Sequence, residues 1–505
     1  MTDHEPAERL SPLDVAFLAL EHAAPMHLGA LLTLAAAPGQ DPPTVSGVAA
    51  VLAARAARVP RLRQRITSTW SPPGGAAWTV DPGFDVHTHV HTHQLPAGGG
   101  WGAVTALTGD LMRRPLELTR PPWALHVLGG LDHDPAGARI MVLVTLHHAL
   151  CDGAGAIRLG MSLLDTTAAH AIHTAESGNT PPGPSPSPVS SARPGRVLRA
   201  AISTATLAAN TAVSWATVAV RDPANTLSQA RARLNAGTGI AVAVARQVRW
   251  PAPRSPLSAP ASAIPFPLPQ RSPFTALRGL RQPRARLVRM LRLDDQDIRR
   301  VRHGLGGTSH DVLLTVLTGA LRTWLAGRGE PAEKARVRAL IPVDQRPRSR
   351  GTGGANQVSG YLCDLPVDRP DPTVRLAVVR AAMQANKATG PRRGAGAMAL
   401  FAHAVPPAAH RVLTPLAARH AKVLFDLVVT TVRLPAVSAA IGGAAVGEVY
   451  PLVPLTPGHA LGIALCHHNG AVHIGLHADR DTVPDLDKLA EAIPAALTEL
   501  ADTAD

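Results

Sequence analysis

The sequence predicts an α/β protein made of two mixed domains joined by a long, partly helical connector. The chain has 505 residues, a length typical of about three domains. Its composition changes at residues 179–195 and 250–283, two segments rich in Pro and Ser that favour extended chain over packed elements. We therefore expect an N-terminal domain over residues 1–176, a connector over 177–285 and a C-terminal domain over 286–505.

In the N-terminal part, local signals place a helix and two strands. Ser11, Pro12 and Asp14 predict a helix start, because Ser is a good cap, Pro suits the first helical position and a carboxylate suits the positive helix end. Apolar runs at 28–34 and 139–146 predict two short, buried strands.

In the C-terminal part, hydrophobic periodicity predicts four elements and a hairpin. The four elements are a strand at 287–293, a helix at 309–326, a strand at 337–343 and an amphipathic helix at 484–500. The hairpin joins strands at 459–468 and 471–478 through Asn469-Gly470, a strong signal for a tight turn.

The composition excludes several classes of protein. Hydrophobic residues at 46% and charged residues at 17% argue against a disordered chain or a long coiled coil. The net charge of +14 suits nucleic acid, a membrane surface or the phosphates of a coenzyme. Because only four of the 50 basic residues are Lys, coding bias explains the excess of Arg equally well. Aromatic residues at 3% and the lack of a known binding motif argue against a nucleic-acid binder.

The cysteines and the start of the chain favour a reducing compartment. Cys151, Cys363 and Cys466 are too few and too widely spaced for a disulfide framework, and the first ten residues do not resemble a secretory signal. We therefore expect a cytoplasmic protein. The uncharged stretch at 200–220 contains seven Ser, Thr or Asn residues, so we expect a helix that packs between the domains or lies at a lipid surface rather than one that spans a membrane.

One segment carries the residues expected to do chemistry. The run IMVLVTLHHALCDGAGAIRLG places His147, His148, Asp152 and Gly153 where a buried strand gives way to a helix. Loops at strand ends commonly present reactive side chains, and a neutral imidazole can accept a proton from a hydroxyl or thiol. We expect Asp152 to brace the loop and Gly153 to permit a turn that a Cβ would block. The alternative is two core histidines and a helix-capping Asp.

The segment His147-His148-Ala149-Leu150-Cys151-Asp152-Gly153 resembles the active-site motif of the bacterial wax ester synthase/diacylglycerol acyltransferase family, part of a wider group of coenzyme A-dependent acyltransferases. Other parts of the chain resemble the same family in the same order. These parts are Leu10-Ser11-Pro12-Leu13-Asp14, Pro25-Met26-His27, Arg114-Pro115-Leu116, Arg120-Pro121-Pro122-Trp123, His310-Asp311-Val312, Leu340-Ile341-Pro342-Val343, Asn356-Gln357-Val358-Ser359, Ala478-Asp479-Arg480 and Val483-Pro484-Asp485.

This resemblance implies two facing domains similar to chloramphenicol acetyltransferase, with the active site in a tunnel between them. It implies that His148 is the general base that deprotonates an acceptor hydroxyl, and that Asp152 keeps the loop in shape. The implied substrates are a long-chain acyl-CoA, as co-substrate, and diacylglycerol or a long-chain alcohol. The resemblance implies no metal and no prosthetic group. Because both implied acceptors dissolve poorly in water, we also expect peripheral contact with the inner face of the plasma membrane or with lipid inclusions.

The sequence departs from the family pattern at two places. Many members have Asn before the Asp of the helix-opening pair, where this chain has His310-Asp311. The resemblance makes His310, Asp311 and Asn356 candidates for the tunnel wall and for stabilising the oxyanion. The family also commonly has Asn-Val-Pro-Gly where Thr431 to Leu434 stand here. These departures favour an alternative, a weakly active or non-catalytic paralogue that binds acyl-CoA or lipid; an acyltransferase with another acceptor is a further alternative.

Other signals are weaker. His87, His89, His91 and His93 alternate, so on one strand they share a face. No Cys or carboxylate joins them at a zinc spacing, and we favour a solvent-facing or tunnel-rim strand over a metal site.

Cys151 is not expected to be a nucleophile, and His467-His468 is expected to be hairpin sequence. The arginines at 278–292 are expected to form a solvated basic face rather than a coenzyme contact.

Overall fold

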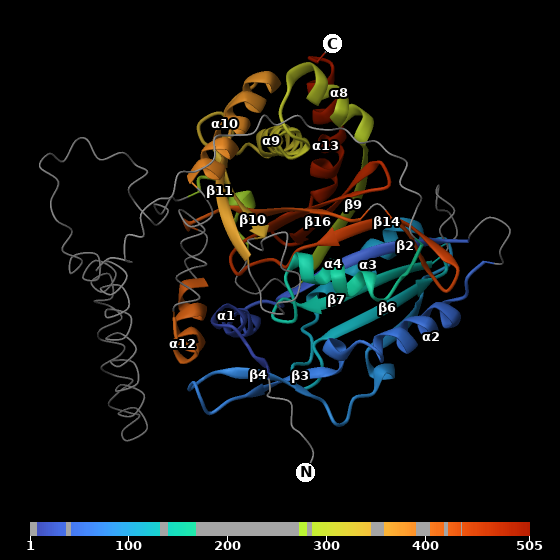
Figure 1. The fold of residues 1–505 in the computed structure, drawn as a ribbon. Helices are drawn as coiled ribbons and strands as arrows, with labels where there is room; N and C mark the ends of the chain where they lie inside the picture. Colours follow the sequence, from blue (N-terminus) through green and yellow to red (C-terminus); the bar gives the residue numbers. More distant parts are fainter. Residues whose placement is uncertain are drawn as a thin grey trace, which may run out of the picture.

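The computed structural model describes residues 8–36, 42–131, 140–167, 272–279, 285–344, 358–389, 405–418, 423–435 and 437–504. These residues form two large β-sheets with helices packed against them (Figure 1). The predicted α/β class is confirmed. The predicted helices of the connector, including the stretch at 200–220, lie outside the described residues.

The first sheet has seven strands in the order β5-β6-β7-β2-β14-β13-β8. Their bounds are β2 His27–Ala35, β5 Val90–Gln94, β6 Trp123–Gly129, β7 Ile140–His147, β8 Asp165–Thr167, β13 Ser438–Ile441 and β14 Ala444–Leu452. Helix α2 (Val45–Ala56) packs on one face of this sheet. Helix α3 (Gly100–Arg113) packs on the other face and also touches the second sheet.

The second sheet has six strands in the order β11-β10-β12-β15-β16-β9. Their bounds are β9 Arg286–Asp294, β10 Val337–Asp344, β11 Val358–Leu365, β12 Leu427–Arg433, β15 Leu461–His468 and β16 Ala471–Asp479. Four helices gather on one side of it, at the top of Figure 1: α8 Asp295–Leu305, α9 Ser309–Gly327, α10 Pro372–Thr389 and α13 Leu486–Ala501. Their buried Leu, Val and Ile side chains form one core with the sheet.

A third group of elements lies at the bottom left of Figure 1. Helix α1 (Pro12–Glu21) packs beside α12 (Pro407–Ala418). Below them is a three-stranded sheet in the order β1-β4-β3, with β1 at Glu8–Arg9, β3 at Gln64–Ser68 and β4 at Ala76–Val80. Helix α4 (Gly153–Met161) and three short 3₁₀ turns, η1 Pro60–Arg63, η2 Val86–Thr88 and η4 Thr275–Leu277, complete the described elements.

The first sheet contains two strands from the C-terminal part of the sequence, which the sequence did not predict. β13 and β14 come from the C-terminal part of the sequence but belong to the first sheet, where β14 pairs antiparallel with β2. β14 also lies against the second sheet: a Cβ at Gly475 on β16 would stand 2.0 Å from the Pro451 carbonyl oxygen. Only glycine permits so close an approach, so this position fixes how tightly the sheets pack.

Several predicted elements are confirmed for the expected physical reasons. Ser11 caps α1 in a reciprocal box with Asp14, whose backbone N–H donates to the Ser11 hydroxyl over 3.2 Å. Asn469 and Gly470 join β15 and β16 with φ of 48° and 70°, the left-handed conformation of a tight hairpin turn.

The four alternating histidines, His87, His89, His91 and His93, do not all lie on one strand. A 3₁₀ turn, η2, carries His87, while only His91 and His93 lie on β5. His89 is buried, and its ring stacks on Trp123 at 4.5 Å. The single-face prediction is therefore wrong, because the turn breaks the alternation before the strand begins.

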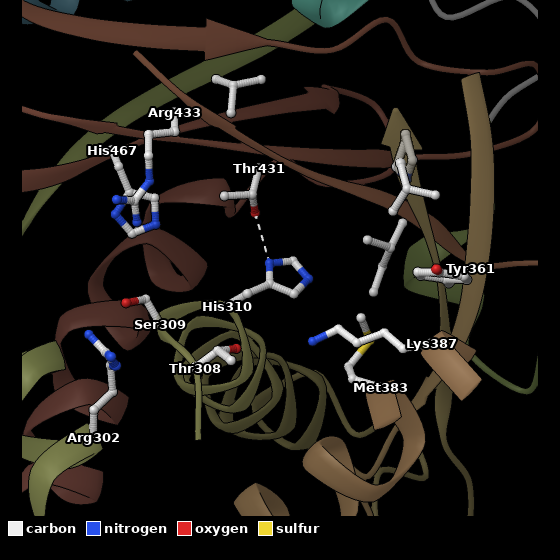
Figure 2. A pocket seen from close by; sticks show the side chains of 14 residues that line it. Arg302, Thr308, Ser309, His310, Tyr361, Met383, Lys387, Thr431, Arg433 and His467 are labelled. Atoms are coloured by element: carbon white, nitrogen blue, oxygen red, sulfur yellow. Dashed lines mark hydrogen bonds between the residues drawn. The ribbon is translucent and has the colours of Figure 1, made fainter. Parts of the chain in front are cut away.

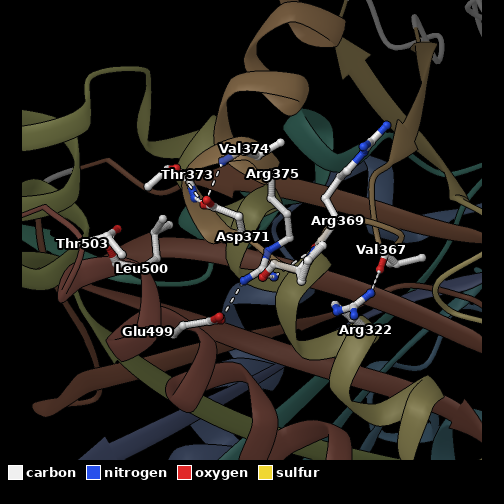
Figure 3. Close-up of polar contacts among 11 residues, drawn as sticks. Arg322, Val367, Arg369, Asp371, Thr373, Val374, Arg375, Glu499, Leu500 and Thr503 are labelled. Carbon is white, nitrogen blue, oxygen red and sulfur yellow. Dashed lines mark hydrogen bonds and ion pairs between the residues drawn. The ribbon is translucent and has the colours of Figure 1, made fainter.

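Polar contacts fix helix α10 against its neighbours (Figure 3). The buried guanidinium of Arg375 donates to Glu499 on α13 over 2.6 Å and to the carbonyl of Pro370 over 2.7 Å. Asp371 accepts the backbone N–H of Thr373 over 2.7 Å and so caps the helix. α10 is therefore held as a rigid wall, and its later residues line the cavity described below.

Candidate active site

The histidine motif occupies the junction between β7 and α4. β7 ends at His147, and α4 begins at Gly153 with Asp152 as its cap. The buried Asp152 carboxylate accepts the Gly155 backbone N–H over 2.8 Å, which satisfies one of the free donors of the first helical turn. The local sequence thus forces the chain to turn sharply just after the second histidine.

His148 is a partly buried residue, and an apolar neighbour covers one face of its ring. The ring stacks on Phe17 of α1, with centroids 4.0 Å apart and planes 14° from parallel. Burial lowers the pKa of His148 from 6.5 to about 4, an effect that contact with its own backbone and the nearby Asp152 charge only partly offset. The ring is therefore neutral near pH 7, the form that accepts a proton.

His147 has a different environment and is fully buried. Its Nδ1 accepts the Ala149 backbone N–H over 3.0 Å, which puts the proton of a neutral ring on Nε2. That nitrogen lies 3.3 Å from Oε2 of Glu21, whose side chain is 7% exposed. The ring is therefore held between the backbone of its own loop and the Glu21 carboxylate.

Glu21 also connects the histidine motif to the preceding loop. Its Oε2 accepts the backbone N–H of Met26 over 2.6 Å, and the Met26 carbonyl accepts the backbone N–H of His148 over 2.8 Å. Phe17 and Glu21 are four residues apart, so they share one face of α1. One helix face thus touches both histidines, Phe17 at the ring of His148 and Glu21 at the ring of His147.

The structure does not support the expected need for glycine at position 153. A Cβ there would have only Val432 Cγ1 within reach, at 3.8 Å. At Gly155, in contrast, a Cβ would lie 2.7 Å from Cys151 Cβ. The tight approach in the motif thus falls two residues later than predicted, because the chain folds back onto Cys151 within the first turn of α4.

His310, from the second group of candidate residues, lines a cavity in the C-terminal part (Figure 2). The cavity has a volume of about 710 Å³. Its lining residues come from α8, α9, β10, β11, α10, β12 and β15: Arg302, Thr308, Ser309, His310, Ile341, Pro342, Val343, Tyr361, Met383, Lys387, Thr431, Val432, Arg433 and His467. His310 Nδ1 lies 3.2 Å from the Thr431 hydroxyl. Burial lowers the pKa of His310, so this ring is also neutral near pH 7.

The other predicted residues of this group have different positions. Asp311 is buried and caps α9 in a reciprocal box with Thr308, whose hydroxyl donates to the carboxylate over 2.7 Å. It is not among the residues that line the cavity. Asn356 lies outside the described residues.

Val432 connects the cavity to the histidine motif. It lines the cavity and is also the nearest neighbour of a Cβ built at Gly153. The wall formed by β12 therefore reaches the first residue of α4, although His148 itself is not one of the lining residues.

Three further observations bear on alternative chemistry. Cys151, Cys363 and Cys466 are buried and form no disulfide bond with one another. Over the described ranges, no group of three or more His, Cys, Asp or Glu side chains is placed to hold a metal ion. No helix in the described part of the chain is both long and apolar enough to cross a membrane.

Sequence reasoning missed Phe17, Glu21, Arg302 and Lys387. The first two had a usable signal, since their spacing puts them on one face of a helix that the Ser11 cap had already located. Arg302 and Lys387 had none, because only the packing of α8 and α10 brings them to one cavity.

Comparisons with known proteins identify the same family as the sequence motifs. The sequence profile of the wax ester synthase/diacylglycerol acyltransferase catalytic domain matches residues 10–313, and the profile of the C-terminal domain of these proteins matches residues 354–501. A relative from Mycobacterium tuberculosis, named as a candidate diacylglycerol O-acyltransferase, is 28% identical over 506 residues, which cover 99% of this chain and 91% of the relative.

Two solved structures share the fold. A wax ester synthase/diacylglycerol acyltransferase from Marinobacter aquaeolei VT8 superposes with a TM-score of 0.63 at 21% identity, over 98% of this chain and 99% of that one. The first condensation domain of the CDA synthetase superposes with a TM-score of 0.53 at 15% identity, over 100% and 98% of the two chains. The expected fold of the coenzyme A-dependent acyltransferases is thereby confirmed.

Proposed function

Because the chain belongs to the wax ester synthase/diacylglycerol acyltransferase family, it is an O-acyltransferase, and we propose that His148 is its general base. The proposed reaction transfers a long-chain acyl group from acyl-CoA to diacylglycerol or a long-chain alcohol. Names of relatives support the diacylglycerol acceptor. The reaction uses acyl-CoA as co-substrate and no other cofactor.

In this proposal the neutral ring of His148 takes the proton of the acceptor hydroxyl. The alcohol oxygen forms a bond to the thioester carbon, the carbon–sulfur bond then breaks, and the proton passes from His148 to the departing coenzyme A thiolate. The observation that carries the proposal is the contrast within the histidine pair: His148 stays partly accessible and neutral, while His147 is sealed against Glu21.

His310 is the proposed donor to the oxyanion. In the tautomer in which its Nδ1 accepts from the Thr431 hydroxyl, Nε2 carries a proton that can be donated. Donors aimed at a developing oxyanion are commonly worth about 10²–10³ in kcat. Asp152 holds the loop in position through its cap on α4.

We also propose that the acceptor is taken up at a lipid surface, since diacylglycerol and long-chain alcohols dissolve poorly in water. The test is sedimentation with phospholipid vesicles that contain diacylglycerol. Protein that stays in the supernatant at every vesicle concentration would contradict this part of the proposal.

The general base is tested with His148→Ala, assayed by release of coenzyme A from a long-chain acyl-CoA with diacylglycerol or a fatty alcohol. We expect turnover to fall about 10²–10⁴-fold. The matched control is His87→Ala, which removes an exposed histidine from the η2 turn and should leave turnover unchanged. Wild-type turnover in His148→Ala would refute the role of His148.

The second candidate function is a weakly active O-acyltransferase or one with another acceptor, because His310 stands where the family pattern described above has Asn. Under that alternative, the wild-type protein binds acyl-CoA but releases coenzyme A only slowly with diacylglycerol or a long-chain alcohol. A panel of alcohols, diacylglycerols and amines in the same assay distinguishes the two functions and identifies the acceptor.

A further inference from the structure

The cavity beside His310 is lined by three cationic side chains that come from three different elements. Arg302 lies on α8, Lys387 on α10 and Arg433 at the end of β12 (Figure 2). No Asp or Glu is among the lining residues in the part of the chain that the structure describes. Like charges gathered around one space repel each other unless an anion joins them, so the arrangement favours a negatively charged ligand.

Within the described ranges, none of these three cations forms an ion pair, in contrast to several of their neighbours. On the same helix as Arg302, Arg299 pairs with Asp295 over 2.7 Å and Arg300 with Asp297 over 2.8 Å. Arg289, within the segment expected to form a basic face, pairs with Asp487. Carboxylates thus neutralise part of the positive charge near the cavity, but not the charge of the three cations that line it.

The start of helix α9 also lines this space. Thr308 and Ser309 stand at this end of the helix, but the hydroxyl and the backbone N–H of Thr308 donate to the Asp311 carboxylate, so Ser309 is the residue whose hydroxyl can serve a ligand. The histidines that line the cavity, His310 and His467, are neutral near pH 7 because burial lowers the pKa of each. Among the described residues that line the cavity, the fixed charge therefore comes from the two arginines and the lysine.

We infer that Arg302, Lys387 and Arg433 form a phosphate-binding subsite for the nucleotide end of acyl-CoA. The inference rests on the proposed function for the identity of the ligand. A volume of about 710 Å³ falls within the range of small-molecule sites. Val432 connects the subsite to α4 of the histidine motif, so a ligand anchored here can extend toward His148. A phosphate-bearing lipid offers the same chemistry and is distinguished below.

The first experiment measures binding without turnover. Titration calorimetry compares coenzyme A, adenosine 3′,5′-bisphosphate and pantetheine on the wild-type protein and on Arg302→Gln, Lys387→Gln and Arg433→Gln. We expect each substitution to weaken the first two ligands about two- to fivefold, as for exposed charge pairs, and to leave pantetheine unchanged. Arg299→Gln is the matched control: it removes the same charge from the same helix, and its binding should equal wild type.

The second experiment is kinetic and separates the sources of phosphate. KM should rise in the three variants for acyl-CoA but not for the same acyl group on pantetheine, while kcat stays within about twofold. The KM for acyl-CoA should also rise with salt in the wild type and much less in the triple variant, because salt screens exposed charges. Competition by phosphatidic acid vesicles that is stronger than competition by adenosine bisphosphate would assign the site to a lipid and overturn the inference.

Other outcomes separate the inference from the proposed function. Coenzyme A that binds the variants as tightly as wild type, or that binds the wild type no better than pantetheine, overturns the subsite while leaving His148 as base. A different result is wild-type turnover in His148→Ala together with coenzyme A binding that depends on the three cations. That result would refute the role of His148 as general base and would support the phosphate-binding subsite. Thermal melting of every variant shows whether it is folded.

Discussion

The two histidines proposed to act on the substrate have opposite surroundings. The His148 region is closed: an aromatic ring covers the imidazole, a sealed second histidine lies beside it, and the nearby acidic groups, Glu21 and Asp152, are buried. The His310 region is open, with exposed cations around a cavity and a single hydrogen bond from the ring to Thr431. Chemistry that needs a tuned pKa is thus assigned to the closed region, and recognition of a charged ligand to the open one.

The two regions should therefore respond differently to amino-acid substitution. In the closed region, two hydrogen bonds through the backbone of Met26 connect the carboxylate of Glu21 to the backbone of His148. A substitution there disturbs the fold and the chemistry together. In the open region, a substitution should change binding or turnover while stability stays nearly constant.

The largest expected effect is a decrease in the free energy of unfolding at acidic pH. It is caused by buried histidines in the closed region and at the adjoining interface between the sheets. Burial lowers the pKa of His27 to about 4 and that of His477 to about 3, while an unfolded histidine titrates near 6.5. Below pH 6.5 the unfolded chain therefore binds protons that the folded chain does not. The free energy of unfolding should stay constant above about pH 7 and fall, as the pH decreases from 6.5 to 4, by about 1.4 kcal/mol per pH unit for each of these histidines.

Denaturant unfolding at pH 8, 7, 6 and 5 checks this expectation. His477→Gln should reduce the slope by the contribution of one histidine. A free energy of unfolding that does not change between pH 7 and pH 5 would contradict the buried, neutral state of these rings.

The next effect concerns the open region. His310→Ala removes the proposed oxyanion donor and should lower kcat about 10²-fold or more, while His310→Asn keeps an N–H donor and should retain most of the activity. Both variants should unfold within about 0.5 kcal/mol of wild type, because His310 is only partly buried. Steady-state kinetics and denaturant unfolding on the same samples measure the two quantities. A large loss of stability in either variant would show that the open region is not independent of the fold.

The smallest effect is a shift in pH dependence. Phe17→Ala uncovers the His148 ring and admits water, so the pKa of His148 should rise from about 4 toward 6.5. The acid limb of kcat/KM should then move to higher pH by about one unit, with little change at pH 8. Phe17→Leu keeps an apolar cover and should shift the limb less. Identical acid limbs in all three proteins would mean that Phe17 does not control the base.

Much of this picture could be predicted from short-range signals. The Ser11 cap, the Asn469-Gly470 turn and the histidine motif each depend on neighbouring residues, and each is found where the sequence places it. The resemblance to the acyltransferase family gave the fold and named His310 as a candidate. Such features can be predicted because their conformation depends on neighbouring residues more than on distant parts of the chain.

The remaining features depend on long-range packing and could not be predicted. Nothing in residues 444–452 indicates that this strand joins β2 rather than the strands that follow it. The tight glycine of the motif was placed at 153 instead of 155, because the fold-back onto Cys151 is visible only in three dimensions. The three cations of the cavity are 46 to 131 residues apart in sequence, so no spacing rule connects Arg302 with Lys387 or Arg433.

The crossing of β14 into the first sheet has a consequence for synthesis of the protein. Until residues 444–452 leave the ribosome, the apolar strand His27–Ala35 has no neighbour on one side. Such an unpaired edge is a template for aggregation. The nascent chain must therefore keep this edge covered through most of translation, and a fragment that stops before residue 444 should aggregate or recruit a chaperone.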